Sequence, residues 1–249
     1  MPSVVEYHRP TNLDEALRLL SQPNTRALGG GTVVVPEARV HRDVGMSLVD
    51  LQDLGLEGIT VAGTQLTVGS MVRLGDLMID GRVPELIRDL ARRELPSTLR
   101  NQATVGGTIA LGSGDSVLLA GLLVHGAVVT LRQSGTQVPE DKPLAQSLSD
   151  CVGQGIVVSV TIETTGRGAI EGTGRTPADV PIVAAIARRS AEGVRVALTG
   201  VGPSPIEVLA DDPTAGLEPP SDFRGTGDYR LHLAGVLTER AAASIQGAS

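Results

Sequence analysis

Aromatic residues are scarce in this sequence. Its 249 residues include two Tyr, one Phe and no Trp. A groove for single-stranded nucleic acid stacks the bases on several aromatic side chains, so this composition disfavours that function. The hydrophobic fraction is nevertheless 41%. A chain of this length can therefore bury a sizeable core of Val, Leu, Ile and Ala, and we do not expect it to be disordered.

Cysteine is almost absent as well. Cys151 is the only one in the chain. No disulfide can close within the chain, and no four-cysteine iron–sulfur or zinc site can form from it. The four histidines lie far apart and match no metal-ligand spacing. The sequence therefore predicts no metal site in this chain.

Positive charge and long apolar runs are also in short supply. The net charge is −7, and an acidic balance attracts neither a nucleic-acid backbone nor an anionic membrane surface. The longest apolar stretch, Val117 to Val129, contains two glycines and a histidine. It is shorter than the ~20 residues that a membrane-spanning helix needs. The N-terminus lacks the apolar region of a signal peptide. These features predict a cytoplasmic protein without a membrane span.

Several familiar catalytic motifs are missing. The sequence has no Gly-x-Ser-x-Gly of a serine hydrolase and no Gly-Lys-Ser/Thr of a Walker loop. It also lacks a Gly-x-Gly-x-x-Gly motif followed by an acidic residue after the next strand. We therefore expect no catalytic acid, base or nucleophile in this chain.

Hydrophobic periodicity predicts strands and helices in irregular alternation. Such a pattern favours an α+β fold over a doubly wound sheet. A glycine-rich stretch is predicted to be a boundary or mobile loop, and a later stretch rich in Pro, Gly and Asp an extended connection. The predicted helices are 11–22, 74–79, 84–95, 115–124, 178–189 and 229–245, the strands 47–51, 127–132, 156–162 and 194–201, the hairpin 59–70, the loop 166–176 and the connection 209–227.

Two glycine-rich turns are the candidate ligand site. Residues 29–32 follow a short strand and precede an apolar continuation, and residues 104–108 form a second turn that we expect between apolar strands. Glycine lets a ligand approach the backbone, and successive N–H groups can bind a phosphate. One such turn is more often structural, but two suit a dinucleotide, which needs more than one backbone-lined approach. Asp115 could accept hydrogen bonds from a ribose. Alternatively, Asp115 or Ser113 could cap the following helix.

These segments resemble a known family. Residues 27–32 and 103–109 resemble the two FAD motifs of the molybdenum hydroxylase flavoprotein subunits. This group includes the medium subunit of carbon monoxide dehydrogenase and the FAD domain of xanthine dehydrogenase. The opening helix, residues 66–70 and the closing segment from Asp228 also resemble the family in order and spacing. Thr108 stands where the second motif usually has Asn.

The resemblance implies a fold and a cofactor. The fold would be α+β, with a two-subdomain FAD-binding domain of the molybdopterin-dehydrogenase (PCMH-like) type over residues 1–165, divided roughly into 1–52 and 53–165. A small C-terminal domain like that of carbon monoxide dehydrogenase flavoproteins would follow over 172–249. FAD would lie between the subdomains, and Asp115 would hold the ribose of its adenosine half. The other implied FAD-binding residues are Gly29, Gly30, Gly31, Thr32, Val33, Thr104, Gly106, Gly107, Thr108 and Ala110.

The resemblance also implies an oxidoreductase and its partners. Such a chain passes electrons from the [2Fe–2S] clusters of a small subunit through FAD to NAD, a quinone or oxygen. A large molybdopterin subunit carries the substrate chemistry, and relatives commonly form a dimer of heterotrimers. One alternative is a structural subunit of the same complex with a degenerate FAD site. Another is a stand-alone FAD oxidoreductase, a class that usually tethers its flavin through His or Cys, which residues 28–35 lack.

Overall fold

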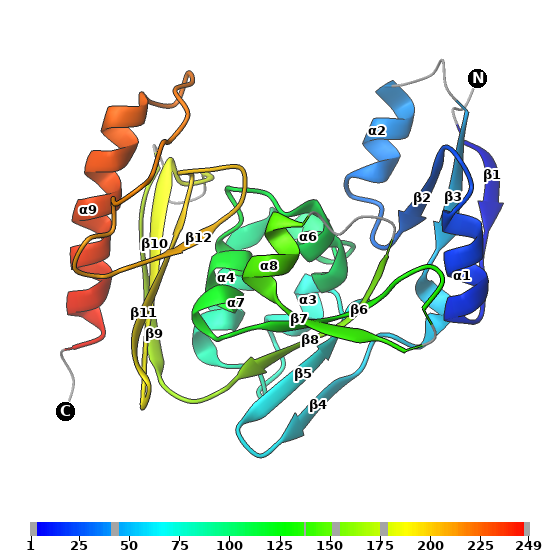
Figure 1. Ribbon diagram of the computed structural model, residues 1–249, viewed down its shortest axis with the longest axis horizontal. Coiled ribbons are helices and arrows are strands. Elements are labelled where there is room, and N and C mark those ends of the chain that lie inside the picture. The colour runs from blue at the N-terminus through cyan, green and yellow to red at the C-terminus, as the bar shows by residue number, and fades with distance from the viewer. Residues whose placement is uncertain (1–3, 41–44, 137, 151–154, 175–178, 247–249) are drawn as a thin grey trace.

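The computed structural model describes residues 4–40, 45–136, 138–150, 155–174 and 179–246, which hold three β-sheets (Figure 1). The N-terminal sheet is parallel and has the order β1-β3-β2 (Val4–His8, Met46–Asp50, Thr25–Leu28). Helix α1 (Leu13–Leu20) packs on it through Ala16 and Leu17. The predicted helix over 11–22 is confirmed, and its cap Asn12 accepts the Glu15 N–H at 2.9 Å.

The middle sheet is antiparallel and has the order β4-β5-β8-β6-β7. The predicted hairpin over 59–70 forms its β4 and β5. Helix α7 is buried along its whole length, which explains a sequence that is apolar on every side. The strands are β4 Ile59–Ala62, β5 Gln65–Gly69, β6 Val128–Arg132, β7 Glu140–Pro143 and β8 Ile156–Glu163, and the helices are the 3₁₀ turn η1 Gln52–Leu54, α3 Leu74–Leu77, α4 Glu85–Glu94, α5 Ser97–Arg100, α6 Val105–Leu111, α7 Val117–Val124 and α8 Leu144–Ser149.

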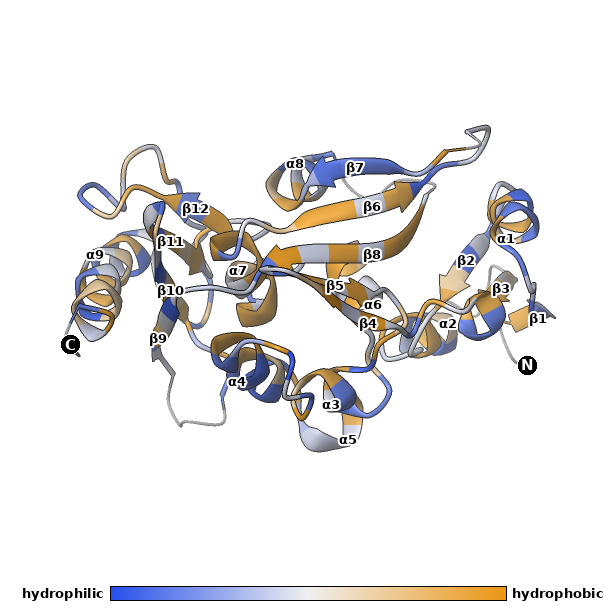
Figure 2. Ribbon diagram, turned by 90° about the horizontal axis from the view of Figure 1, so that it is seen from below, coloured by the Kyte–Doolittle hydropathy of each residue, from blue (hydrophilic) through white to orange (hydrophobic). Residues whose placement is uncertain are grey.

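The C-terminal sheet lies between two helices. Its antiparallel order is β12-β11-β10-β9 (Ile206–Val208, Gly193–Thr199, Val183–Ser190, Arg167–Thr173). Helix α9 (Gly227–Ser244) covers one face and α7 lies against the other (Figures 1 and 2). The predicted extended connection over 209–227 and the closing helix are both confirmed. In the described ranges, no helix is long and apolar enough to cross a membrane.

The predicted helix over 178–189 is wrong, because this segment contains strand β10. Residue 178 itself lies outside the described part of the chain. Ala184 and Ile186 belong to the core formed with α7, whereas Val183 and Ala185 belong to the core formed with α9. The first five residues of β10 are buried on both faces and are all apolar, so they lack the alternation that identifies a half-buried strand.

The glycine-rich stretch over 166–176 was predicted as a boundary or mobile loop. In its described part it forms strand β9, so the loop alternative is wrong there. One of its glycines, Gly168, serves close packing. A Cβ atom on Gly168 would lie 2.3 Å from Leu86 Cδ2 on α4 and 2.9 Å from the Ala187 carbonyl oxygen. The sheet can therefore approach α4 because residue 168 has no side chain.

The surroundings of both glycine turns also differ from the prediction. The apolar continuation after the first turn is helix α2 (Val34–Val40), and the second turn opens α6 instead of lying between strands. Thr104 caps α6 by accepting the Gly107 N–H at 3.1 Å. Helix α7 is capped by Ser116, and not by Ser113 or Asp115, because the Ser116 hydroxyl accepts the Leu119 N–H at 3.1 Å.

Polar contacts connect the three sheets. Arg132 on β6 donates to Asp14 on α1 at 2.6 Å. Buried Arg188 on β10 donates to the Thr165 carbonyl, at 2.9 Å from Nε, and to the Val124 carbonyl at the end of α7 at 3.2 Å. These bonds cross from one sheet to the next and help to fix the sheets around the site.

His125 lies buried at the junction of the middle and C-terminal sheets. Its Nδ1 lies 2.6 Å from the Glu163 carbonyl oxygen, and no described residue hydrogen-bonds its Nε2. Burial lowers the pKa of His125 to about 4, and the nearby charges of Arg188 and Arg195 act in the same direction. The folded protein therefore holds this ring neutral at a pH where the unfolded chain would bind a proton.

We predict that His125 makes folding stability depend on pH. The pKa of His125 is about 4 in the folded protein and 6.5 in the unfolded chain. Its contribution to the free energy of unfolding is therefore complete above pH 6.5 and is lost as the pH falls toward 4. Between pH 7 and pH 5 the loss is about 2 kcal/mol. In urea unfolding at both pH values, the free energy of unfolding of His125→Gln should fall less than that of the wild type, and the difference should be this amount. His232→Gln, which alters an exposed histidine on α9, is the control and should behave as wild type.

Candidate functional site

The two glycine segments meet where the N-terminal sheet contacts the middle part of the chain. Gly30 lies so close to the backbone before α6 that a Cβ atom on it would be 1.8 Å from the Gln102 carbonyl oxygen. Any side chain at this position would force the two segments apart. Gly30 is therefore required for the contact that brings the two predicted motifs together.

A cleft of about 450 Å³ lies between the two segments. Residues from both motifs share its walls, although they are more than 70 positions apart in the sequence. The predicted residues that line the cleft are Gly29, Gly30, Gly31, Thr32, Val33, Thr104, Gly107, Thr108 and Ala110. The tertiary structure thus places most of the candidate site around one volume.

The first segment presents unused backbone donors to the cleft. In the described part of the chain, no residue accepts a hydrogen bond from the N–H groups of residues 29–32. Gly31 has a φ of +72°, a left-handed conformation that residues with a Cβ rarely adopt. Successive free N–H groups around such a turn can bind an anion. This segment therefore fits the diphosphate of a dinucleotide.

The second segment forms one side of the cleft but offers few unbonded N–H groups to a ligand. The N–H groups of Val105 and Gly106 already donate to the carbonyls of Val72 and Ser70, at 2.9 and 2.7 Å. Gly106 is buried and lies outside the cleft lining, and a Cβ on it would be 2.6 Å from Ser70 Cβ, so its predicted contact with FAD stays a prediction. The Thr108 hydroxyl donates to the Thr104 carbonyl at 3.2 Å and keeps its own oxygen free to accept.

Asp115 lies apart from the cleft lining. Its two carboxylate oxygens accept hydrogen bonds from one guanidinium nitrogen of Arg224, at 3.1 and 2.9 Å. This ion pair joins the start of α7 to the loop before α9. A carboxylate can accept further hydrogen bonds, so its predicted contact with a ribose stays a prediction.

The cleft also contains charged residues that the sequence did not reveal. Arg26 and Glu37, which both line the cleft, form an ion pair at 3.3 Å. Glu94 at the end of α4 accepts the Leu118 N–H of α7 at 2.9 Å, and burial raises the pKa of its carboxyl group. Arg26 lies close to the first turn in sequence, and this proximity was a signal that could have identified it. No local sequence signal identifies Glu94 as a cleft residue.

Two further clefts adjoin this one. A cleft of about 710 Å³ shares Glu94 and Leu95 with it and extends to Ile170 on β9. Another of about 500 Å³ shares the turn at Gly29 and Gly30 and extends toward η1. Together, the linings of the three clefts extend from Arg9, just after β1, past the turn at Gly29 and Gly30, to Ile170 on β9 of the C-terminal sheet. This arrangement suits an elongated ligand with a phosphate near its centre.

Residues 3–162 match a known family, the FAD binding domain in molybdopterin dehydrogenase. The chain belongs to this family. Both glycine segments lie within the matched range, and the cofactor is FAD. The free backbone donors of residues 29–32 and the close contact at Gly30 fit this cofactor.

Relatives cover the chain almost completely. The carbon monoxide dehydrogenase medium chain of Hydrogenophaga pseudoflava is 26% identical over 278 residues, 97% of this chain and 96% of its own length. The uncharacterized protein YgfM of Escherichia coli K12 is 28% identical over 265 residues, 98% of each chain. The resemblance to the carbon monoxide dehydrogenase medium chain and to oxidoreductase subunits is thereby confirmed.

Solved structures show the same fold. A chain of carbon monoxide dehydrogenase from Hydrogenophaga pseudoflava superposes with a TM-score of 0.88 at 22% identity, covering 99% of this chain and 98% of that one. A chain of quinoline 2-oxidoreductase from Pseudomonas putida 86 gives a TM-score of 0.86 at 22% identity, with 99% of each chain covered. The predicted α+β class is confirmed.

We predict that Gly30→Ala separates the two glycine segments. The added Cβ would lie 1.8 Å from the Gln102 carbonyl oxygen, and overpacking of this kind costs about 1–3 kcal/mol of stability. FAD affinity should fall by at least about ten-fold, because a loss of about 1.4 kcal/mol of binding free energy already has this effect. Flavin fluorescence titration and thermal unfolding measure both quantities. Gly58→Ala, whose Cβ would have no neighbour within 4 Å, is the matched control; equal binding by the two variants would contradict the prediction.

Proposed function

We propose that this chain is the FAD-binding electron-transfer subunit of a heteromeric molybdenum-containing hydroxylase or dehydrogenase. It would receive electrons from the [2Fe–2S] clusters of a small partner subunit and deliver them through FAD to an external acceptor. A large subunit with molybdopterin would carry the substrate chemistry. The observation that supports the proposal most directly is that both glycine segments line a common cleft in a chain of this family.

The chain's own residues would bind and orient the cofactor. Bound FAD supplies the redox chemistry. The N–H groups of residues 29–32 would hold its diphosphate, and Thr104 and Gly107 would form the opposite wall of the cleft. Leu95, Leu99 and Leu111 would exclude water from the apolar parts of the same cleft.

The need for partners follows from the composition. Cys151 is the one cysteine of the chain and lies outside the described residues. A single thiolate cannot ligate an iron–sulfur cluster that needs four protein ligands, so clusters in the electron path must belong to another chain. The relatives named medium chains support an assembly of this kind, for which we propose a dimer of heterotrimers. NAD, a quinone and oxygen all stay open as acceptors.

We further propose that the chain is divided into an FAD-binding domain and a C-terminal domain. The N-terminal sheet falls within residues 1–52 and the middle sheet within 53–165, the two subdomains that the sequence predicts. Strand β9 begins at Arg167 and pairs with β10. The boundary is therefore better placed just before β9 than after it, and the C-terminal domain would begin near residue 166.

The proposal predicts that electron delivery depends on the FAD cleft while assembly does not. In a purified complex, substrate should reduce first the clusters and then FAD, as followed by visible absorption in a stopped-flow instrument. A complex with Gly30→Ala should assemble and reduce its clusters but pass few electrons to the acceptor. Acid release should yield about one FAD per copy of the chain in the wild-type complex. A wild-type complex without flavin would instead favour a structural subunit with a degenerate site, an alternative that Thr108 in the second motif suggests.

A further inference from the structure

The lining of the cleft of about 450 Å³ offers little positive charge to a dianionic cofactor. The charged residues that line it in the described part of the chain are one cation, Arg26, and two carboxylates, Glu37 and Glu94. The diphosphate of FAD carries two negative charges. Backbone N–H groups can bind it without formal charge, but the acidic lining opposes its entry unless a cation faces it.

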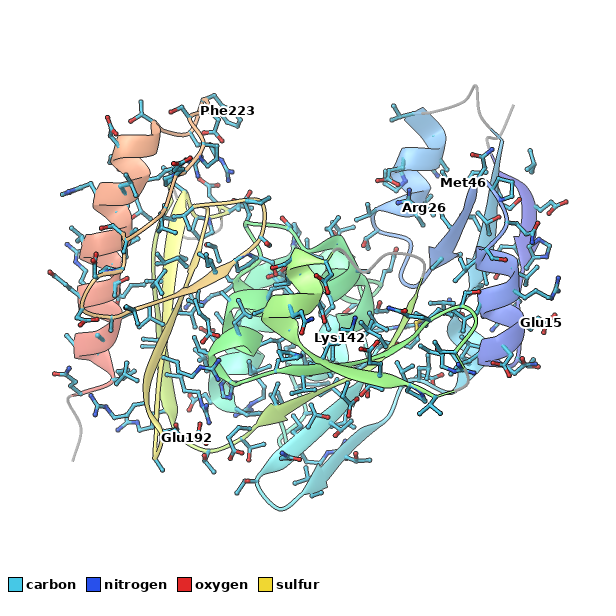
Figure 3. The ribbon with its side chains drawn as sticks, in the orientation of Figure 1. Glu15, Arg26, Met46, Lys142, Glu192 and Phe223 are labelled. Carbon is cyan, nitrogen blue, oxygen red and sulfur yellow. The ribbon has the colours of Figure 1, made fainter. Side chains whose placement is uncertain are left out.

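Arg26 is placed to supply that cation. It lies on β2, three residues before Gly29, and its side chain stands beside α2 (Figure 3). One guanidinium nitrogen lies 3.3 Å from Glu37 Oε2. The side chains of Arg26 and Glu37 are 57% and 39% exposed, and an ion pair this long and this exposed contributes little to stability. Exchanging its partner therefore costs little.

We propose that Arg26 is a positioning residue for the FAD diphosphate, and that Glu37 competes with the phosphate for its guanidinium group. A planar guanidinium fork matches the geometry of phosphate oxygens and has donors to spare beyond one contact with Glu37. The free N–H groups of residues 29–32 lie in the same cleft. The phosphate would thus be held between the turn and the arginine. This inference rests on FAD as the cofactor.

The two members of the pair should have opposite effects. Arg26→Gln removes the attraction and should weaken FAD binding roughly ten-fold, which is the scale of one charge-assisted hydrogen bond that is partly exposed to solvent. Glu37→Gln removes both a competitor for Arg26 and a repulsive charge, and it should tighten binding by roughly two- to five-fold. If the ion pair served only to hold α2 against β2, both variants would bind FAD more weakly and unfold at a lower temperature.

The test is a titration of the flavin-stripped full chain, in the complex from which it is purified, with FAD, ADP and riboflavin as probes. Dissociation constants are measured by flavin fluorescence or calorimetry at two salt concentrations. FAD and ADP should both respond to Arg26→Gln, with a smaller salt dependence in the variant, while riboflavin, which has no phosphate, should not. Arg18→Gln and Glu85→Gln neutralise exposed charges on α1 and α4 that line none of the three clefts, and they control for net charge.

The outcomes separate this inference from the proposed function. Opposite shifts for Arg26→Gln and Glu37→Gln, with both controls within about two-fold of wild type, support it. Tight FAD binding by Arg26→Gln, or weaker binding by both variants together with lower melting temperatures, overturns it while the FAD site stands. Failure of the wild-type complex to bind FAD at all would overturn both the inference and the function on which it rests.

Discussion

The close approach of Gly30 to the backbone at Gln102 is the contact on which the site depends. A Cβ at residue 30 would lie 1.8 Å from a carbonyl oxygen, so the two segments can touch only through bare backbone. This contact joins the end of a parallel sheet to the start of a helix in the middle part of the chain. Beside this contact lies a cleft whose one side carries the N–H groups of residues 29–32, which no described residue accepts, and whose other side is the capped first turn of α6.

The rest of the molecule supports that contact from both sides. Ile156 of the middle sheet packs in one cluster with Ala16 and Leu17 of α1, and the Arg132–Asp14 pair adds a charged bond between the same parts. On the other side, α7 is shared between the middle core and the C-terminal sheet. Glu94 caps α7 from the wall of the cleft, so the helix that carries the C-terminal sheet also helps to shape the site. These contacts hold the sheets at fixed positions around the cleft.

The sequence identified the two segments that line the cleft more reliably than some of the elements around them. The glycine segments, the first helix and the hairpin over 59–70 were recognisable because capping residues, turns and alternation are local signals. The segment over 178–189 was predicted as a helix because β10 is buried on both faces and has no alternation to reveal it. The glycines of β9 indicated a loop, whereas one of them serves close packing against α4. Arg26, Glu37 and Glu94 were missed as cleft residues, since their meeting depends on three elements that are distant in the chain.

The sequence by itself determined the low aromatic content, the lack of cluster ligands and the two glycine segments with their likeness to a flavoprotein family. These are properties of residue type and spacing, which do not depend on packing. The tertiary structure alone decided that the N–H groups of residues 29–32 have no acceptor among the described residues, while those of Val105 and Gly106 are already bonded. It also decided that Gly106 packs against Ser70 and that Asp115 is held by Arg224. The physical reason is that a backbone donor or a carboxylate is available to a ligand only if no other part of the fold has satisfied it, and that partner can come from anywhere in the chain.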